Sequence, residues 1–135
     1  MRRIFADTYY WVALLNPKDE GHRQAIEIGP TISNCVLMTT EEVLSEVLTF
    51  FSSRGPGART AVTSLIENIL ADEKIVVLPQ SHESFMQGLA LYRMRLDKGF
   101  SMIDCIVMAA MRKDGVLEVL THDDHFRQEG FTTLL

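Results

Sequence analysis

The residues of this sequence with the clearest chemical potential are acids that lie far apart along the chain. They fall in four segments, which hold Asp7, the glutamates Glu41, Glu42 and Glu46, Asp104, and the pair Asp123 and Asp124. Carboxylates gathered in one place raise each other's pKa, and hard divalent cations such as Mg²⁺ relieve the repulsion between them. A carboxylate cluster that holds one or two Mg²⁺ ions suits phosphodiester hydrolysis, because the ions activate water and clamp the scissile phosphate.

No other catalytic apparatus competes with these acids. The sequence has no G-x-S-x-G motif and no glycine-rich phosphate loop. Cys35 and Cys105 lie in apolar surroundings without the spacing of a zinc motif, and we expect both to be reduced core residues. His122 and His125 flank an acidic pair, so they are either solvated turn residues or ligands of a Zn²⁺ or Mn²⁺ cluster.

Asp104 is the only charge in the segment 100–111, which is apolar on every side of the expected helix. Such a helix is buried. A carboxylate there needs a hydrogen-bond donor, a cation or a metal. Ser101-x-x-Asp104 also resembles a capping box, so a structural role for Asp104 stands beside the functional one.

Short apolar runs alternate with helical stretches along the whole chain. Strands are expected at 4–6, 36–38, 75–78, 117–120 and 131–134. Helices are expected at 8–15, 19–28, 41–52, 58–70, 82–96 and 100–111. This alternation predicts a single α/β domain over residues 1–135, with a parallel sheet between two layers of helices.

In such folds ligands bind beyond the carboxyl ends of the strands. Asp7 and Asp123 directly follow strands, and Asp104 lies in the first turn of a helix that should start near the same edge. We therefore expect these acids to meet. Each also has a simpler interpretation, since Asp7 can cap the following helix and Asp123 can form an Asx-turn.

The helix expected at 41–52 supplies the remaining acid. Its periodicity does not choose among three glutamates, Glu41, Glu42 and Glu46. Thr39 and Thr40 are both good caps for this helix, and Thr39-x-x-Glu42 fits a capping box.

The composition is that of an ordinary globular protein. Of 135 residues, 47% are hydrophobic and 23% are charged, and no apolar run is long enough to span a bilayer. The N-terminus reaches an acid too early for a signal peptide, so we expect a cytoplasmic protein without a membrane partner. The net charge of −5 argues against binding nucleic acid by charge alone, unless acids gather at a metal that reverses the local field.

The order and spacing of the acids resemble the PIN-domain ribonucleases, and among them the VapC-like toxins of toxin–antitoxin pairs. The resemblance covers essentially the whole chain and is carried by four segments, 4–8 (IFADT), 43–47 (VLSEV), 100–105 (FSMIDC) and 120–126 (LTHDDHF). It implies a three-layer α/β/α fold with a central, mostly parallel sheet of four to five strands. It also implies an endoribonuclease that depends on Mg²⁺ or Mn²⁺, often a homodimer, with an RNA substrate and a cognate antitoxin protein.

The same resemblance assigns residue roles. Catalysis and metal binding fall to Asp7, Glu46, Asp104 and Asp123. Thr8 and Thr121 are expected to orient carboxylates or waters around the metal. Asp124 stands beside Asp123 as a second candidate for the fourth acid. Tyr9 and Tyr10 are bulkier than the family pattern suggests and can line a groove or an interface, whereas Trp11 is expected in the core.

An RNA backbone needs positive contacts, and two basic groups are available. Arg54 and Arg59 flank a glycine-rich turn, and Arg93, Arg95 and Lys98 precede the segment with Asp104. Either group can contact phosphates, and either can equally be a solvated face with ordinary ion pairs.

Other functions fit less well. A phosphatase of the haloacid-dehalogenase type needs a second Asp where Tyr9 stands, and a receiver domain needs an Asp after the strand at 75–78. The remaining alternative is a catalytically weak or inactive PIN-fold module that binds RNA or protein. Metal-dependent thermal stabilisation distinguishes the two, because a module without a working site should show little of it.

Overall fold

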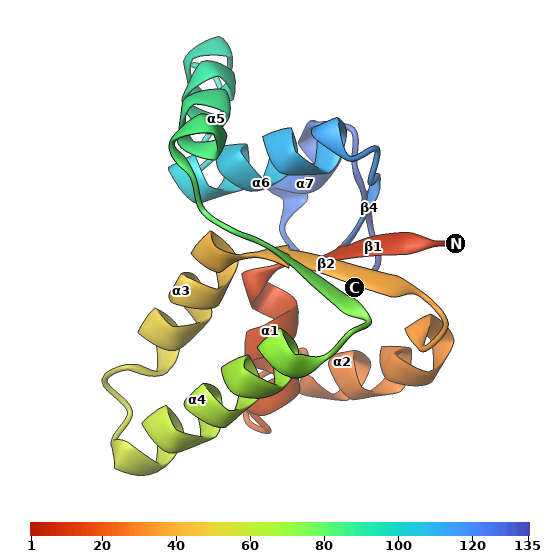
Figure 1. Cartoon of the computed structure of the whole chain (residues 1–135), viewed down its shortest axis with the longest axis vertical. Coiled ribbons are helices and arrows are strands. Elements are labelled where there is room, and N and C mark those ends of the chain that lie inside the picture. Colours follow the sequence, from red (N-terminus) through yellow and green to blue (C-terminus); the bar gives the residue numbers. More distant parts are fainter.

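Five parallel strands form the middle layer of the molecule (Figure 1). The computed structural model describes all residues, 1–135. The strands are β1 (Arg3–Ala6), β2 (Val36–Thr40), β3 (Ile75–Leu78), β4 (Glu118–Leu120) and β5 (Thr132–Thr133). Their order in the sheet is β3-β2-β1-β4-β5, and every neighbouring pair is parallel. The predicted α/β fold with a parallel sheet is confirmed.

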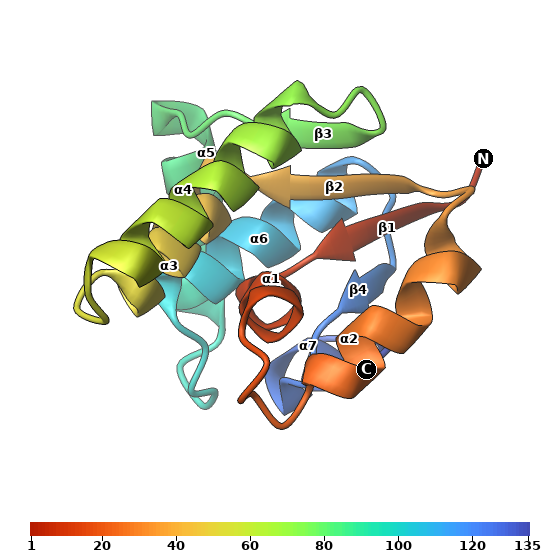
Figure 2. The same ribbon diagram turned by 90° about the horizontal axis from the view of Figure 1, so that it is seen from below.

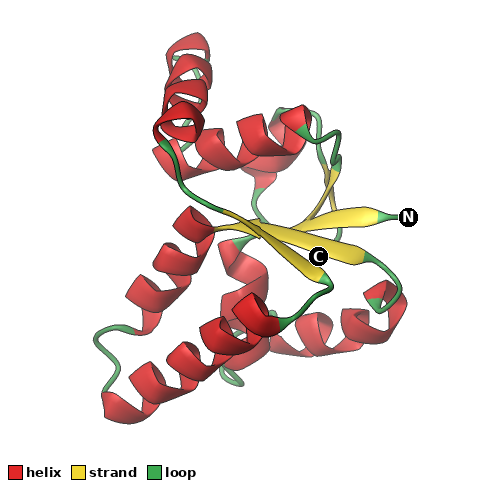
Figure 3. Ribbon diagram, in the orientation of Figure 1, coloured by secondary structure: helices red, strands yellow, loops and turns green.

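Helices cover both faces of this sheet (Figure 3). One face carries α1 (Thr8–Leu15), α2 (His22–Ile28), α3 (Glu41–Phe51) and α4 (Pro56–Ala71). The other carries α5 (His82–Met94), α6 (Met102–Lys113) and α7 (Asp124–Gln128). A 3₁₀ turn, Gly29–Ile32, leads into β2. Figure 2 shows the order β3-β2-β1-β4 from below, with α1 seen end-on beside the end of β1. No helix combines the length and the hydropathy needed to cross a membrane.

The central strands are buried on both faces, which explains why they read as uninterrupted apolar runs. Ile4, Phe5 and Ala6 of β1 are at most 1% exposed. Trp11 of α1 and Cys105 of α6 are also buried in the core, as expected. Both cysteines are free thiols.

Helix boundaries differ from the expected ones for local reasons. Helix α4 begins at Pro56, because proline suits the first helical turn, where its missing N–H has no partner to lose. Helix α6 begins at Met102 and leaves Phe100 buried outside the helix. The capping box between Thr39 and Glu42 is wrong: Thr39 lies in β2 and donates to the carbonyl of Ala6 at 3.0 Å.

Thr40 is the residue that caps α3. Its hydroxyl accepts a hydrogen bond of 3.2 Å from the backbone N–H of Val43. Because α3 starts directly at the end of β2, its first turns lie at the carboxyl edge of the sheet. That placement decides which of its glutamates can meet the other acids.

Helices α5 and α6 pack closely at a glycine. A Cβ atom added at Gly88 would lie 2.4 Å from Cγ1 of Ile106, so only a residue without a side chain fits there. Glu129, the residue after α7, binds Arg95, the residue after α5, and Arg112 in the last turn of α6. Its carboxylate accepts from Arg95 Nε at 2.7 Å and from Arg112 Nη1 at 2.5 Å. These contacts fix the loop that leads into α6.

Candidate metal centre

The acids meet where the strand order reverses. The chain runs outward from β1 through β2 to β3, then crosses back to place β4 on the other side of β1. In open parallel sheets such a switch point leaves a crevice at the carboxyl edge. Asp7 follows β1 and Asp123 follows β4, and the backbone N–H of Asp7 donates to the carbonyl of Leu120 at 3.3 Å.

An open cavity of about 510 Å³ lies at this edge and is lined by all four predicted acids. We call it the acidic cavity. Its lining residues are Asp7, Thr8, Tyr9, Glu46, Gly99, Ser101, Asp104, Thr121, His122, Asp123 and His125. The sequence-based expectation that these carboxylates gather at one edge of the sheet agrees with this geometry.

Asp7 is the most deeply buried of the four acids, with 8% of its surface exposed. Burial raises its pKa to about 7, against hydrogen bonds from the Thr8 backbone and the Thr121 hydroxyl that lower it. The charges of Asp104 and Glu46 raise the pKa of Asp7 further. The buried carboxyl group therefore holds a proton over much of the acidic range, and a cation in the cavity would take the place of that proton.

Glu46 is selected from the three glutamates of α3 by its neighbour on α1. Thr8 Oγ1 donates to Glu46 Oε1 at 2.6 Å. Glu41 instead accepts from the backbone N–H of Gln80 at 2.7 Å, and Glu42 lines a different cavity beside α5 and α6. Only Glu46 is on the side of α3 that faces the other acids.

Asp104 forms the capping box that the sequence suggested, and it also lines the acidic cavity. The Ser101 hydroxyl accepts from the Asp104 backbone N–H, and Asp104 Oδ2 accepts from the Ser101 backbone N–H, both at 3.0 Å. The capping box is thus complete. The side chain of Asp104 also lines the acidic cavity, since the cap engages only one of its two oxygens.

Asp123 caps the short helix α7, and Asp124 points elsewhere. Asp123 Oδ1 accepts from the backbone N–H of His125 at 2.9 Å. The side chain of Asp124 is 74% exposed and pairs with Arg127 at 2.8 Å. Asp124 does not line the acidic cavity, so the expectation that it belongs to the site is not met, and the geometry favours Asp123 as the fourth acid.

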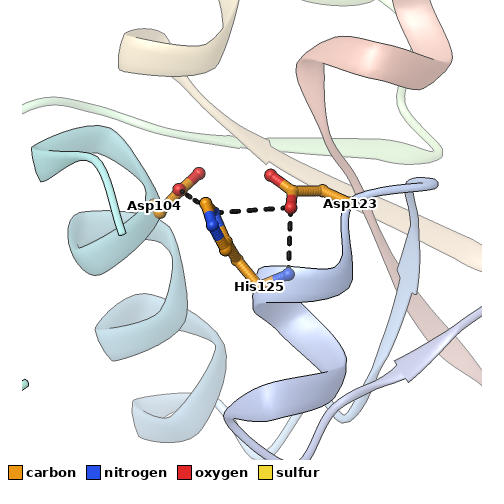
Figure 4. Close-up of side chains that lie close together, drawn as sticks. All are labelled: Asp104, Asp123 and His125. Carbon is orange, nitrogen blue, oxygen red and sulfur yellow. Dashed lines mark hydrogen bonds and ion pairs between the residues drawn. The ribbon is translucent and has the colours of Figure 1, made fainter. Parts of the chain in front are cut away.

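His125 is the residue whose place the sequence left open, and it lies inside the site. Its Nδ1 atom is 3.3 Å from Asp104 Oδ2 and 3.4 Å from Asp123 Oδ1 (Figure 4). His122 lines the same cavity and stacks on Tyr9, with ring centroids 5.9 Å apart. Tyr9 therefore lines the acidic cavity, which agrees with the expectation that it lines a groove or an interface. Tyr10 is buried.

The donor set suits a hard divalent cation. One ligand atom from each of Asp104, Asp123 and His125 can be chosen so that all lie within 4.8 Å of one another. Asp7 and Glu46 line the same cavity and add carboxylate oxygens. Carboxylate ligands with room for water are typical of Mg²⁺ and Mn²⁺ sites.

The arginines predicted to contact phosphate already make contacts within the protein. Arg95 is tied to Glu129 through both Nε and Nη2, and Arg112 shares the same carboxylate, so the bidentate face of the Arg95 guanidinium is occupied. Arg54 donates to the carbonyl of Phe50 and lies 4.2 Å over its ring. Arg59 donates to the carbonyl of Ser52.

Lys98 is 3.5 Å from Asp97, and Arg93 is exposed on the last turn of α5. The expectation that Arg54, Arg59, Arg93 and Lys98 contact phosphate groups stays a prediction.

The fold and the acidic cavity define a member of the PIN-domain family. The profile of the PIN domain matches residues 4–131, and the chain belongs to this family. The chain is 29% identical over 129 residues to the 23S rRNA-specific endonuclease VapC20 of Mycobacterium tuberculosis, covering 95% of both proteins.

Solved structures agree with this assignment. The crystal structure of VapC20, a sarcin-ricin loop cleaving toxin, matches with a TM-score of 0.85 and 26% identity over 96% of each chain. DNA-bound VapBC from Salmonella typhimurium matches with a TM-score of 0.70 and 14% identity, over 99% of this chain and 98% of the other. FitAcB from Neisseria gonorrhoeae matches with a TM-score of 0.67 and 13% identity, over 98% and 96%. The last two similarities are similarities of fold.

Proposed function

We propose that this protein is an endoribonuclease that depends on Mg²⁺ or Mn²⁺ and is the toxin of a toxin–antitoxin pair. The observation that carries the proposal is the convergence of Asp7, Glu46, Asp104 and Asp123 in one cavity at the switch point of the sheet. The similarity to VapC20, a named endonuclease, along nearly the whole chain supports the same reaction class.

In this proposal the four carboxylates bind the cation, and two threonine hydroxyls orient two of the carboxylates by hydrogen bonds. Thr8 fixes one oxygen of Glu46 at 2.6 Å, and Thr121 fixes one oxygen of Asp7 at 3.0 Å. A bound Mg²⁺ or Mn²⁺ supplies activation of water and neutralisation of the phosphate charge. The residues themselves supply orientation, since an ordered carboxylate loses less freedom when the cation binds.

The same proposal extends to partners. VapC20 is named for 23S rRNA, so ribosomal RNA is the first substrate class to test. Arg54, Arg59, Arg93 and Lys98 are the basic residues proposed to contact its phosphates. The similarity of fold to chains in VapBC and FitAcB structures supports a cognate antitoxin protein as partner. A homodimer remains part of the proposal.

The decisive experiment is cleavage of ribosomal and mixed RNA by purified protein with Mg²⁺, with Mn²⁺ and with EDTA. Asp7→Asn serves as the inactive variant and Asp124→Asn as the matched control, because Asp124 is an exposed acid outside the cavity. We expect metal-dependent cleavage by wild type and Asp124→Asn only. Folded protein that neither cleaves RNA nor is stabilised by Mn²⁺ would instead support the inactive binding module.

A further inference from the structure

Each carboxylate of the acidic cavity accepts a hydrogen bond from a particular protein group. Glu46 has the hydroxyl of Thr8, and Asp7 has the hydroxyl of Thr121. Neither Asp104 nor Asp123 accepts a hydrogen bond from a threonine hydroxyl. The side chain that reaches both of them is the imidazole of His125 (Figure 4).

The tautomer of His125 follows from its neighbours. Nδ1 faces two carboxylate oxygens, Asp104 Oδ2 at 3.3 Å and Asp123 Oδ1 at 3.4 Å. Because an ionised carboxylate only accepts hydrogen bonds, the tautomer that makes the bond to Asp104 carries its hydrogen on Nδ1. The contact with Asp104 is a hydrogen bond, and the contact with Asp123 is a close approach of opposite partial charges.

The ring is held in place from sides other than the acids. It packs edge-on against Phe100, with ring centroids 5.3 Å apart, and Phe100 is buried. A Cβ atom at Gly99 would lie 3.6 Å from Nε2, so the loop before α6 passes close to the far side of the ring. The next residue, Phe126, is fully buried and anchors α7 in the core. The position of Nδ1 is therefore set by packing.

The oxygens that His125 contacts are already engaged, and this leaves the others free. Asp104 Oδ2 also accepts from the Ser101 backbone, and Asp123 Oδ1 also accepts from the His125 backbone at 2.9 Å. The second oxygen of each carboxylate accepts no protein hydrogen bond. In Figure 4 the two second oxygens lie above the imidazole and face each other across the gap between Asp104 and Asp123. The imidazole thus joins one oxygen from each acid and leaves the other for a ligand.

We propose that His125 is a positioning residue that sets the separation of Asp104 and Asp123 through its Nδ1–H, so that their free oxygens can bind one cation. This inference rests on the proposed metal-dependent function and adds a residue to it. Loss of such an outer partner costs about 10- to 100-fold in metal affinity or activity. In this role Nδ1 carries the hydrogen and does not bind the cation, so His125 groups with Asp104 and Asp123 as the residue that holds these two ligands.

The test compares substitutions by where they place a donor. The side-chain amide nitrogen of His125→Asn can occupy the position of Nδ1, whereas that of His125→Gln reaches the position of Nε2. His125→Leu removes the donor. His82→Leu is the matched control, because His82 is exposed at the start of α5 and far from the acids in the chain. Mn²⁺ affinity is measured by calorimetry on each protein, with metal-free thermal unfolding as the check on folding.

We expect Mn²⁺ affinity about tenfold or more below wild type for His125→Leu and His125→Gln, and near wild type for His125→Asn and His82→Leu. Should His125→Leu fail to fold, the comparison of the Asn and Gln variants decides. Wild-type affinity in His125→Gln overturns the positioning role. Equal weakness of the Asn and Gln variants also overturns it, because the imidazole itself would then be required. If wild type itself binds no Mn²⁺, the proposed function fails, and the positioning role with it.

Discussion

The hydroxyl of Thr121 donates a hydrogen bond of 3.0 Å to Asp7 Oδ2, across 114 positions of sequence. This bond joins the loop after β4 to the acid after β1 at the point where the strand order reverses. Thr121 is fully buried, so the hydroxyl has no water to replace Asp7 as its partner. The contact both stabilises the charged form of Asp7 and fixes the orientation of its carboxylate.

Thr121→Val should therefore weaken Mn²⁺ binding by about tenfold, since valine keeps the shape and loses the donor. Thr121→Ser retains the hydroxyl and should bind Mn²⁺ nearly as well as wild type. Calorimetry on the three proteins checks this. Equal affinity of the Val and Ser variants for Mn²⁺ would show that the hydroxyl does not orient Asp7.

Asp7→Asn should abolish metal-dependent cleavage, with a loss larger than the roughly 100-fold that removal of an outer partner costs. The amide has the same shape, but it carries no charge to hold the cation. Metal-free thermal unfolding should show that the variant is folded and no less stable than wild type at pH 7.5. Cleavage at the wild-type rate would remove Asp7 from the proposed site.

The raised pKa of Asp7 gives the metal-free protein a particular pH dependence. The folded state holds the proton up to about pH 7, whereas the unfolded chain releases it near 3.8. The folded state therefore binds more protons in this window, and the contribution of Asp7 to stability is complete below pH 4 and is lost as pH rises through 7. The slope is at most about 1.4 kcal/mol for each pH unit.

Urea unfolding in EDTA between pH 5 and pH 8 measures this effect as the difference between wild type and Asp7→Asn. Wild type should lose stability relative to the variant as pH rises. Adding Mn²⁺ should reverse the trend for wild type alone, because the cation stabilises the ionised carboxylate. Parallel curves for the two proteins in EDTA would mean that Asp7 titrates normally.

Glu129 should be more important for stability than other paired acids. Its side chain is 4% exposed, and its pKa is lowered by the guanidinium groups of Arg95 and Arg112. Its stabilisation is present above the pKa of the unfolded chain and is lost as pH falls. Because both arginines are partly exposed, the effect is screened, and we expect Glu129→Gln to lower the melting temperature by roughly 5 °C.

Glu118→Gln provides the comparison for Glu129→Gln. Glu118 pairs with Arg2 at 2.8 Å on the surface, where both side chains are substantially exposed. Its loss should change the melting temperature by less than the loss of Glu129. A scan of both variants at neutral pH decides whether burial controls the difference.

Gly88→Ala should destabilise the fold, although alanine favours helices over glycine by about 1 kcal/mol. The added methyl group would lie 2.4 Å from Ile106 Cγ1 and 3.0 Å from the Ile106 backbone, so α5 and α6 would have to separate. Overpacking of this kind costs about 1–3 kcal/mol. In Gly57→Ala the methyl group meets nothing within 4 Å, and that variant should be neutral or more stable in urea unfolding.

The sequence by itself determined the class of the sheet, parallel and between two layers of helices, and the local positions of three of the acids. Asp7 and Asp123 follow apolar strands, and the carboxyl ends of parallel strands share one edge, so their convergence follows from local pattern and topology. The capping box of Ser101 and Asp104 is equally local. These predictions depend on neighbours within a few residues, which a sequence displays directly.

Only the tertiary structure shows the contacts that separate similar residues, which periodicity had left open. The family resemblance pointed to Glu46, and in the structure Glu46 is the glutamate that the hydroxyl of Thr8 reaches, from 38 positions away. Asp123 and Asp124 are adjacent in sequence, but the start of α7 turns one toward the cavity and the other toward Arg127. Such choices depend on which face of an element meets a distant segment, and periodicity cannot rank polar residues that lie outside the apolar stripe.

For Arg95 and His125, too, the sequence pattern did not reveal the partner that each side chain has in the fold. Arg95 has the charge of a phosphate contact, but Glu129, 34 positions away, takes its guanidinium. His125 has the pattern of a turn residue, but α7 and the loop before α6 bring it within 3.4 Å of two acids. A charged or polar side chain bonds to whatever partner the fold places beside it, and that partner is set by packing across the whole domain.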